Sequence, residues 1–268
     1  MNRLDRRFER LKREHKKAVV FFLTAGDPSL KVTAQFLDFA DQRGVDCIEI
    51  GVPFSDPIAD GPVIQASSFR AIGRGVTLTK ILKLVSDARR RGVKVPIVLM
   101  SSFNPIFSYG VDRFAKDAQA SGVDGAIVPD LPLNEASGFV RSLKPRGLHY
   151  IMMVTPTTRD ARRRQIARQS TGFIYYVSLT GVTGERKRTK LPFAGDVAKL
   201  RRQSKTPVCV GFGISTPEDA GTISKFSDGI IVGSALVKNL TAHSRGNLSD
   251  ASKRFVAGFV RAVKGDIR

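Results

Sequence analysis

Two carboxylates, Glu49 and Asp60, are the residues whose types and spacing could do chemistry. They bracket the segment IEIGVPFSDPIADGP at positions 48–62. Its first part reads as a buried strand, and because side chains alternate along a strand, Glu49 points away from Ile48 and Ile50. An acid among apolar residues is costly to bury without a partner, which indicates a function for Glu49. The prolines and glycine of the second part predict a loop that leaves the strand and carries Asp60.

A carboxylic acid in an apolar pocket has a raised pKa and can exchange protons near neutral pH. We therefore predict that Glu49 is a general acid and base. Asp60 lies on a more polar loop, where we expect it to stay ionised and to accept a hydrogen bond. The alternatives are a structural role for Glu49 and a turn-capping role for Asp60. Spacing alone does not separate Asp60 from Asp56 on the same loop.

The second chemical feature is a pair of glycine-rich strand ends, GFGIS at 211–215 and VGSA at 232–235. Free N–H groups at helix starts bind phosphate well, although tight turns need glycine in any case. Both motifs together, after the last two predicted strands, favour a phosphate site. Gly184 could add a third contact from the loop SLTGVTGERKRT at 178–189, which we interpret as a mobile lid rather than a plain solvated connection.

An apolar wall is predicted between the acids and the phosphate loops. Its members fall near strand ends: Phe22, Met100, Ile127, Tyr175 and Phe212. If they line the mouth of the fold, the ligand has a flat apolar end and a phosphate end. The alternative is that they belong only to the core.

Short apolar runs alternate with amphipathic stretches along the whole chain. The predicted strands are 18–24, 46–50, 95–100, 125–128, 149–154, 173–177, 208–210 and 229–232, and the predicted helices between them are 31–43, 79–91, 111–121, 135–143, 159–169, 193–203 and 217–226. A last helix is predicted over 249–263. Several helices end at a glycine: Gly44, Gly92, Gly122 and Gly147.

Near-continuous apolar strands joined by helices indicate a parallel sheet, and eight such units predict a single (β/α)8 TIM barrel over residues 1–268. A dinucleotide-binding sheet would need a glycine-rich turn after the first strand, where the chain reads TAGDP at 24–28.

The N-terminal segment 1–17 is highly charged and has no apolar run. Leu4, Phe8 and Leu11 fall on one helical face, so we predict an extra N-terminal docking helix rather than a targeting signal. No stretch approaches the roughly 18 apolar residues of a membrane helix, and we expect a cytoplasmic protein. Cys47 and Cys209 are expected to be buried and reduced, and the three histidines lack metal-type spacing, so no metal site is expected.

The formal net charge of +20 predicts attraction to anions, including anionic substrates and, without specificity, nucleic acid. The basic clusters at 89–91, 162–164 and 186–188 are separate and are not interleaved with aromatic residues. A solvated basic exterior is therefore favoured over a dedicated nucleic-acid function.

The segment 48–62 closely resembles the signature of the tryptophan synthase alpha subunit family. The resemblance continues through GVTG at 181–184, GFGIS at 211–215 and GSA at 233–235, in order and along essentially the whole chain. It implies a lyase of tryptophan biosynthesis that splits indole-3-glycerol phosphate into indole and glyceraldehyde 3-phosphate by a retro-aldol reaction. It also implies an α2β2 complex in which the beta subunit holds pyridoxal phosphate and the alpha subunit needs no cofactor.

By the same resemblance, Glu49 matches the group that tautomerises the indole at C3 and deprotonates the glycerol hydroxyl. Asp60, rather than Asp56, matches the carboxylate that bonds the indole N–H. The pocket wall and lid latch match Phe22, Ile64, Met100, Ile127, Tyr175, Thr183 and Phe212. The residues that bind phosphate in the family match Gly184, Gly213, Gly233 and Ser234. The partner contact matches Pro53, Asp56, Asn104, Phe107 and Asp130. Leu179 and the basic run ERKRTK at 185–190 differ from the residues of familiar family members. These differences bear on closure of the lid and on its coupling to the partner, whereas the catalytic residues are unchanged.

Two other readings are weaker. An indole-glycerol-phosphate synthase or a phosphosugar isomerase would usually need a catalytic lysine on a strand, and none of the predicted strands contains a lysine. A non-catalytic anion- or RNA-binding protein would account for the charge, but it would not account for the Glu49 and Asp60 pair.

Overall fold

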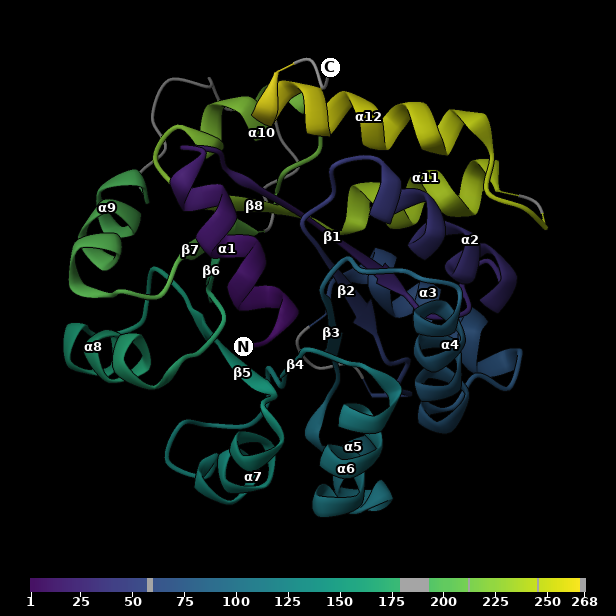
Figure 1. Cartoon of the computed structure of the whole chain (residues 1–268), viewed down its shortest axis with the longest axis horizontal. Coiled ribbons are helices and arrows are strands. Elements are labelled where there is room, and N and C mark those ends of the chain that lie inside the picture. Colours follow the sequence, from purple (N-terminus) through teal and green to yellow (C-terminus); the bar gives the residue numbers. More distant parts are fainter. Residues whose placement is uncertain (57–59, 179–192, 212, 245, 266–268) are drawn as a thin grey trace.

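The computed structural model describes residues 1–56, 60–178, 193–211, 213–244 and 246–265. Eight parallel strands close into a barrel in sequence order, with helices around the outside (Figure 1). The strands are Ala18–Thr24 (β1), Cys47–Gly51 (β2), Ile97–Met100 (β3), Gly125–Ile127 (β4), His149–Val154 (β5), Ile174–Val177 (β6), Val208–Gly211 (β7) and Gly229–Val232 (β8). This confirms the predicted TIM barrel, and β1, β5 and β8 have the predicted bounds.

Most helices confirm the predictions to within about two residues. They are Arg3–Arg13 (α1), Leu30–Gln42 (α2), Pro62–Gly73 (α3), Leu78–Arg90 (α4), Phe103–Tyr109 (α5), Val111–Ser121 (α6), Ser137–Leu143 (α7), Asp160–Gln169 (α8), Ala194–Gln203 (α9), Pro217–Ser224 (α10), Ser234–His243 (α11) and Asp250–Lys264 (α12), with a 3₁₀ turn at Lys144–Arg146 (η1). The glycines predicted to end helices, Gly44, Gly92, Gly122 and Gly147, all have the positive φ that is typical of such positions.

Three helices, α3, α5 and α11, were not predicted. The α3 helix starts at Pro62, inside the segment that the sequence suggested was loop. Proline is well tolerated at the first helical position, because its missing N–H would have no helical partner there. The α11 helix starts directly at Ser234, so the glycine motif before it is the start of a helix as well as a turn.

The two faces of each strand separate the core into an inner and an outer part. Inside the barrel lie the alternate side chains Ala18, Val20, Cys47, Val98, Ile127, Ile151, Tyr175, Cys209 and Ile231. The other faces, such as Phe21 and Leu23 of β1 and Ile48 and Ile50 of β2, pack outward against the helices. Both cysteines are buried and unpaired, as predicted.

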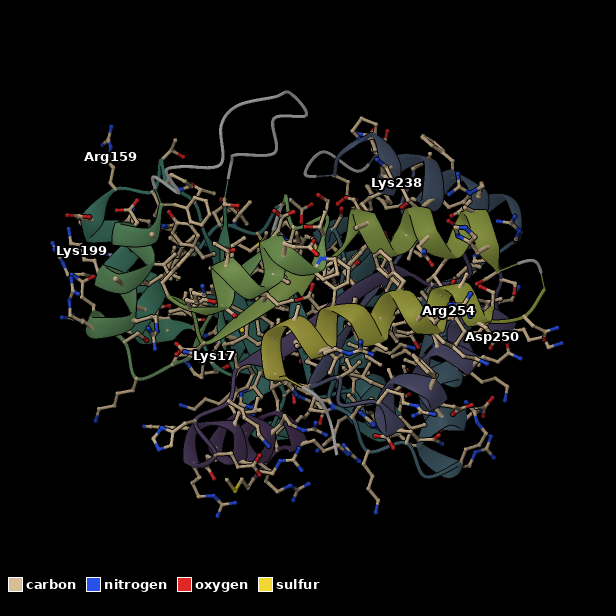
Figure 2. The ribbon with its side chains drawn as sticks, turned by 90° about the horizontal axis from the view of Figure 1, so that it is seen from above. Lys17, Arg159, Lys199, Lys238, Asp250 and Arg254 are labelled. Carbon is tan, nitrogen blue, oxygen red and sulfur yellow. The ribbon has the colours of Figure 1, made fainter. Side chains whose placement is uncertain are left out.

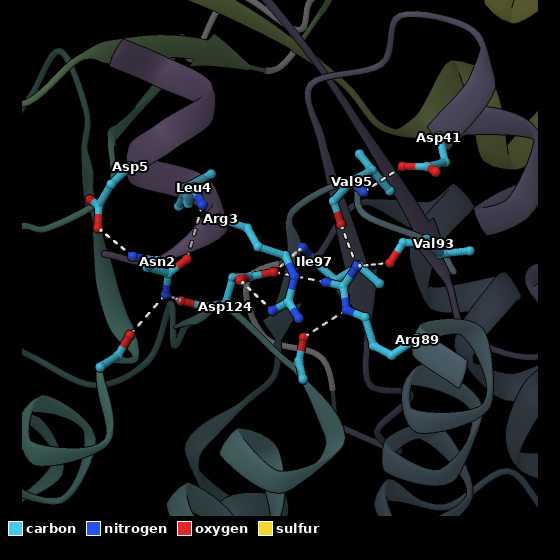
Figure 3. A network of polar contacts seen from close by, with 12 residues as sticks. Asn2, Arg3, Leu4, Asp5, Asp41, Arg89, Val93, Val95, Ile97 and Asp124 are labelled. Carbon is cyan, nitrogen blue, oxygen red and sulfur yellow. Dashed lines mark hydrogen bonds and ion pairs between the residues drawn. The ribbon is translucent and has the colours of Figure 1, made fainter. Parts of the chain in front are cut away.

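The α1 helix lies across the end of the barrel where the strands begin (Figure 1). It buries Leu4, Phe8 and Leu11 there, which confirms the predicted docking face. Two ion pairs hold it to aspartates that precede strands. Arg7 lies 3.1 Å from Asp46. Arg3 lies 3.2 Å from Asp124, and this pair is seen in Figure 3. The opposite end of the barrel, where the strands finish, is left open for a site.

The cations labelled in Figure 2 come from separate parts of the chain. Lys17 precedes β1 and Arg159 precedes α8, whereas Lys199, Lys238 and Arg254 lie on α9, α11 and α12. No helix among the described residues is long and apolar enough to cross a membrane.

Candidate active site

Glu49 lies on the inner face of β2, between Cys47 and Gly51, with Phe22 of β1 and Val98 of β3 beside it in register. Its side chain is fully buried, and neither carboxylate oxygen has a hydrogen-bond partner among the described residues. Burial raises the pKa of Glu49 from 4.5 to about 8. The predicted orientation is confirmed, and the group is protonated at neutral pH, as a general acid must be.

Asp60 stands just before α3, whose first turn is preceded by Gly61. Its backbone carbonyl accepts a hydrogen bond from the side chain of Gln65 at 2.8 Å, which ties the end of the loop to the helix. Burial raises the pKa of Asp60 to about 6. The loop is thus less polar than expected around this carboxylate, although the group is still ionised at neutral pH.

The structure separates Asp60 from Asp56, which the spacing could not do. Asp60 lines a cleft at the open end of the barrel, whereas Asp56 is exposed and accepts a hydrogen bond from the Ser55 hydroxyl at 2.8 Å. The cleft is formed by Phe22, Thr24, Gly51, Val52, Phe54, Asp60, Ile64, Ser68, Met100, Ser101, Ser102 and Pro129. Its volume is about 20 Å³, so a bicyclic ring enters only if the surrounding side chains shift.

The predicted apolar wall divides between two neighbouring clusters. Phe22 packs with Ile64 of α3 and Val237 of α11, and Met100 lies against them. Ile127 and Tyr175 belong to the barrel interior, which Met100 also contacts.

The ring of Tyr175 connects this wall to the two acids. Burial raises the pKa of its phenol well above the usual value, and the charges of Glu49 and Asp60 add to that shift. The phenol of Tyr175 is thus within electrostatic reach of both carboxylates.

Two of the glycines proposed for phosphate, Gly213 and Gly233, follow β7 and β8 at the same end of the barrel. Gly233 precedes the first turn of α11 without a side-chain cap, and Ser234 is exposed at the first position of the helix. A Cβ on Gly233 would lie 3.6 Å from the Cβ of Phe22, so this helix start adjoins the apolar wall. Gly213 is exposed and has a φ of +73°. Uncapped N–H groups at a helix start provide donors for an anion.

Some predicted site residues lie outside the described residues. These are Thr183, Gly184 and Phe212, together with Leu179 and the basic run of the predicted lid.

The sequence reasoning missed Thr24, which lines the cleft and has a buried hydroxyl without a hydrogen-bond partner in the described part of the chain. Its place at the last position of β1 was the available signal, because strand ends form the site in this fold.

The residues predicted to meet a partner lie on the segments after β2, β3 and β4: Pro53 and Asp56 follow β2, Asn104 and Phe107 are on α5, and Asp130 follows β4. Phe107 is 66% exposed, which is unusual for a phenylalanine. Asn104 and Asp130 are also exposed, and Asp130 accepts a hydrogen bond from the Phe103 amide at 2.8 Å. Pro53 is buried.

Two features of the described residues concern other kinds of site, a catalytic lysine and a metal centre. None of the eight described strands carries a lysine, which argues against an indole-glycerol-phosphate synthase or a phosphosugar isomerase that uses a catalytic lysine on a strand. Among the described residues, no group of three or more His, Cys, Asp or Glu side chains is arranged to hold a metal ion.

Comparisons with known proteins agree over nearly the full length. Residues 8–264 match the family model described as tryptophan synthase alpha chain. A tryptophan synthase alpha chain of Pelobacter propionicus is 46% identical over 265 residues, with 99% of both chains covered. One from Geobacter sulfurreducens is 47% identical, with 98% of both covered. The crystal structure of tryptophan synthase subunit alpha from Legionella pneumophila has a TM-score of 0.90 at 37% identity and 98% coverage of both chains.

Proposed function

The chain belongs to the tryptophan synthase alpha chain family, which cleaves indole-3-glycerol phosphate in tryptophan biosynthesis, and from this premise we propose that Glu49 and Asp60 carry out that cleavage. The observation that carries the proposal is the carboxyl of Glu49, which is fully buried inside the barrel and has no hydrogen-bond partner in the part of the chain that the structure describes. Burial of a carboxyl group without a hydrogen-bond partner costs free energy, and a bound ligand that forms a hydrogen bond with the carboxyl would offset that cost.

Glu49 acts first as an acid and then as a base. With a pKa of about 8 it is mostly protonated at neutral pH and can give its proton to C3 of the indole ring. The resulting carboxylate takes the proton of the hydroxyl on the carbon attached to C3. As that O–H bond breaks, a carbonyl forms and the bond between C3 and that carbon breaks. Its electrons return to the ring, and indole and glyceraldehyde 3-phosphate result.

Asp60 stabilises the intermediate of this sequence. Protonation at C3 makes the ring nitrogen positively charged, and an ionised carboxylate that accepts the N–H bond lowers the energy of that state. The pKa of about 6 keeps Asp60 ionised at neutral pH. Its position beside apolar side chains strengthens the interaction, because little water screens it.

The remaining residues bind the two ends of the substrate. Phe22, Ile64, Met100, Ile127 and Tyr175 supply the apolar surface for the indole ring, together with Thr183 and Phe212. Gly213, Gly233 and Ser234 hold the phosphate with backbone N–H groups, together with Gly184. The uncapped start of α11 supports this assignment.

A Glu49→Gln variant tests the proposal directly. Glutamine keeps the shape but cannot exchange the proton, so cleavage should fall by about 10²- to 10⁴-fold. The assay follows indole and triose phosphate released from indole-3-glycerol phosphate, with a circular dichroism spectrum to confirm folding. The matched control is Glu135→Gln, an exposed glutamate before α7, which should keep full activity. Retained turnover in the Glu49 variant would remove that residue from the mechanism.

An alpha chain of tryptophan synthase works with a beta subunit, and we propose that this chain does so as an α2β2 complex in the cytoplasm. The beta subunit would hold pyridoxal phosphate, and this chain would need no cofactor. The contact would involve Pro53, Asp56, Asn104, Phe107 and Asp130, since the exposed ring of Phe107 is suited to burial at an interface. A Phe107→Asp variant should lose co-elution with the beta subunit while it retains its own cleavage activity.

A further inference from the structure

Asp27 is a buried carboxylate that three elements share. It lies on the loop between β1 and α2 and is 3% exposed. Arg70 of α3 binds it through two parallel hydrogen bonds, Nε to Oδ1 at 2.9 Å and Nη2 to Oδ2 at 2.7 Å. The hydroxyl of Thr241 on α11 lies 3.1 Å from Oδ2, and Arg74 lies 3.6 Å from Oδ1. Bidentate pairs of this type fix both distance and orientation.

Each element that meets at Asp27 carries part of the candidate site. The α3 helix follows Asp60 directly and is bonded to its carbonyl through Gln65. The α11 helix begins at Ser234, next to Gly233. The loop that holds Asp27 continues from β1, which carries Phe22. These elements also touch at the wall of the cleft, where Phe22, Ile64 and Val237 form one apolar cluster.

The loop of Asp27 is itself held in place, so the carboxylate is a fixed point. The Gly26 amide donates to the Thr33 hydroxyl at 3.1 Å, and the Ala25 amide donates to the Gly51 carbonyl at 2.9 Å. On α11, Val237 and Thr241 are one turn apart, and the Thr241 hydroxyl lies 2.9 Å from the Val237 carbonyl oxygen. An apolar contact therefore joins the three elements at the site, and the ionic contact at Asp27 joins them a short way beyond it.

We propose that Asp27 and Arg70 are positioning residues that set the separation between the indole-binding carboxylate of Asp60 and the phosphate-binding start of α11. The inference rests on the proposed function, because it concerns the two ends of that substrate. The apolar cluster alone allows helices to slide past one another, whereas two directed hydrogen bonds to a buried charge do not.

The proposal predicts that the binding affinity of a ligand that spans both ends responds differently to mutation than the affinities of its fragments. A ligand that spans both ends gains affinity over its fragments only when the two subsites have the correct spacing. A change in spacing therefore weakens the spanning ligand and leaves each fragment almost unaffected. A purely structural role for the pair would reduce stability without this selective loss.

The experiment uses the full chain and three probes: a non-cleavable indole-3-alkyl phosphate, indole and inorganic phosphate. Arg70→Met should weaken the spanning probe by about ten-fold or more and each fragment by less than about two-fold, as expected for lost alignment. Arg70→Lys, which restores one charged contact, should recover part of the loss. Thr241→Val, which removes only the α11 contact, is the milder variant and should show the same selectivity if Arg70→Met does not fold.

The matched control is Arg91→Met. Arg91, the residue directly after α4, also binds a carboxylate, Asp38 of α2, through bonds of 3.0–3.2 Å, but neither helix carries a proposed site residue. This variant should bind all three probes like the original chain. Equal losses for the spanning probe and the fragments, or no loss in any variant, would overturn the positioning role. If the original chain binds the spanning probe no better than its fragments, the proposed function fails, and with it this inference.

Discussion

The ring of Tyr175 occupies the space that a side chain on Gly211 would need. The two residues lie on neighbouring strands, β6 and β7, and a Cβ on Gly211 would overlap the phenol oxygen and lie 2.6 Å from the ring carbon that bears it. A Cβ essentially never lies within 3.0 Å of a non-bonded atom, so any side chain at position 211 must displace the ring. Tyr175 belongs to the barrel interior, on the same inner side as Glu49, and the glycine therefore leaves room for its ring there.

A Gly211→Ala variant should lower cleavage by an order of magnitude or more, because the displaced ring narrows the space for indole. The measurement is kcat and KM for indole-3-glycerol phosphate. Gly195→Ala on α9 is the control, since a Cβ there meets nothing within 4 Å. Normal kinetics in the 211 variant would mean that the Tyr175 ring can move without cost.

The stability of the chain should depend on pH through Glu49. Its pKa is raised from 4.5 to about 8 on folding, so the folded state holds the proton more tightly than the unfolded chain. The contribution of Glu49 is fully present below about pH 4.5 and is lost as pH rises through 8.

Urea denaturation from pH 5 to pH 9 tests this linkage. The free energy of unfolding of the original chain, relative to Glu49→Gln, should decline with pH up to about 8 and then become constant. A difference that does not change with pH would show that Glu49 ionises as readily in the folded protein as in the unfolded one.

The cleavage rate should have a bell-shaped pH profile. The proposed mechanism needs Asp60 ionised and Glu49 protonated, and their pKa values are about 6 and about 8. The value of kcat/KM should therefore rise through pH 6 and fall through pH 8. The residual activity of Asp60→Asn should lack the acidic limb, while an unchanged profile in that variant would assign the limb to another group.

Asp124 should contribute to stability but not to chemistry. It is buried ahead of β4, where it accepts hydrogen bonds from the Ile97 amide at 2.9 Å and from Arg89 at 2.8 Å (Figure 3). Asp124→Ala leaves a buried amide and Arg89 without this partner, which costs about 3–5 kcal/mol. Chemical denaturation gives the loss, and activity per folded molecule should be unchanged because the residue lies at the end opposite the site. Asp250→Ala, at an exposed pair with Lys253, is the control and should cause little change.

The sequence by itself determined the barrel, the inward direction of Glu49 and the ends of several helices. These follow from local rules: alternation along a strand places Glu49 opposite Ile48 and Ile50, and glycine takes the positive φ that ends a helix. The family signature at 48–62 also required no structure, because its residues are contiguous.

Local pattern did not decide which loop carboxylate reaches the site; the family resemblance pointed to Asp60, and only the tertiary structure gives the physical reason. Asp56 and Asp60 are equivalent in local pattern, and they differ because the loop leads into α3, whose packing against β1 and α11 turns Asp60 toward the cleft. The same holds for Asp27, which is bound by Arg70 and Thr241 from distant parts of the chain. Such contacts depend on closure of the barrel, which brings its first and last strands together, and no local periodicity encodes that meeting.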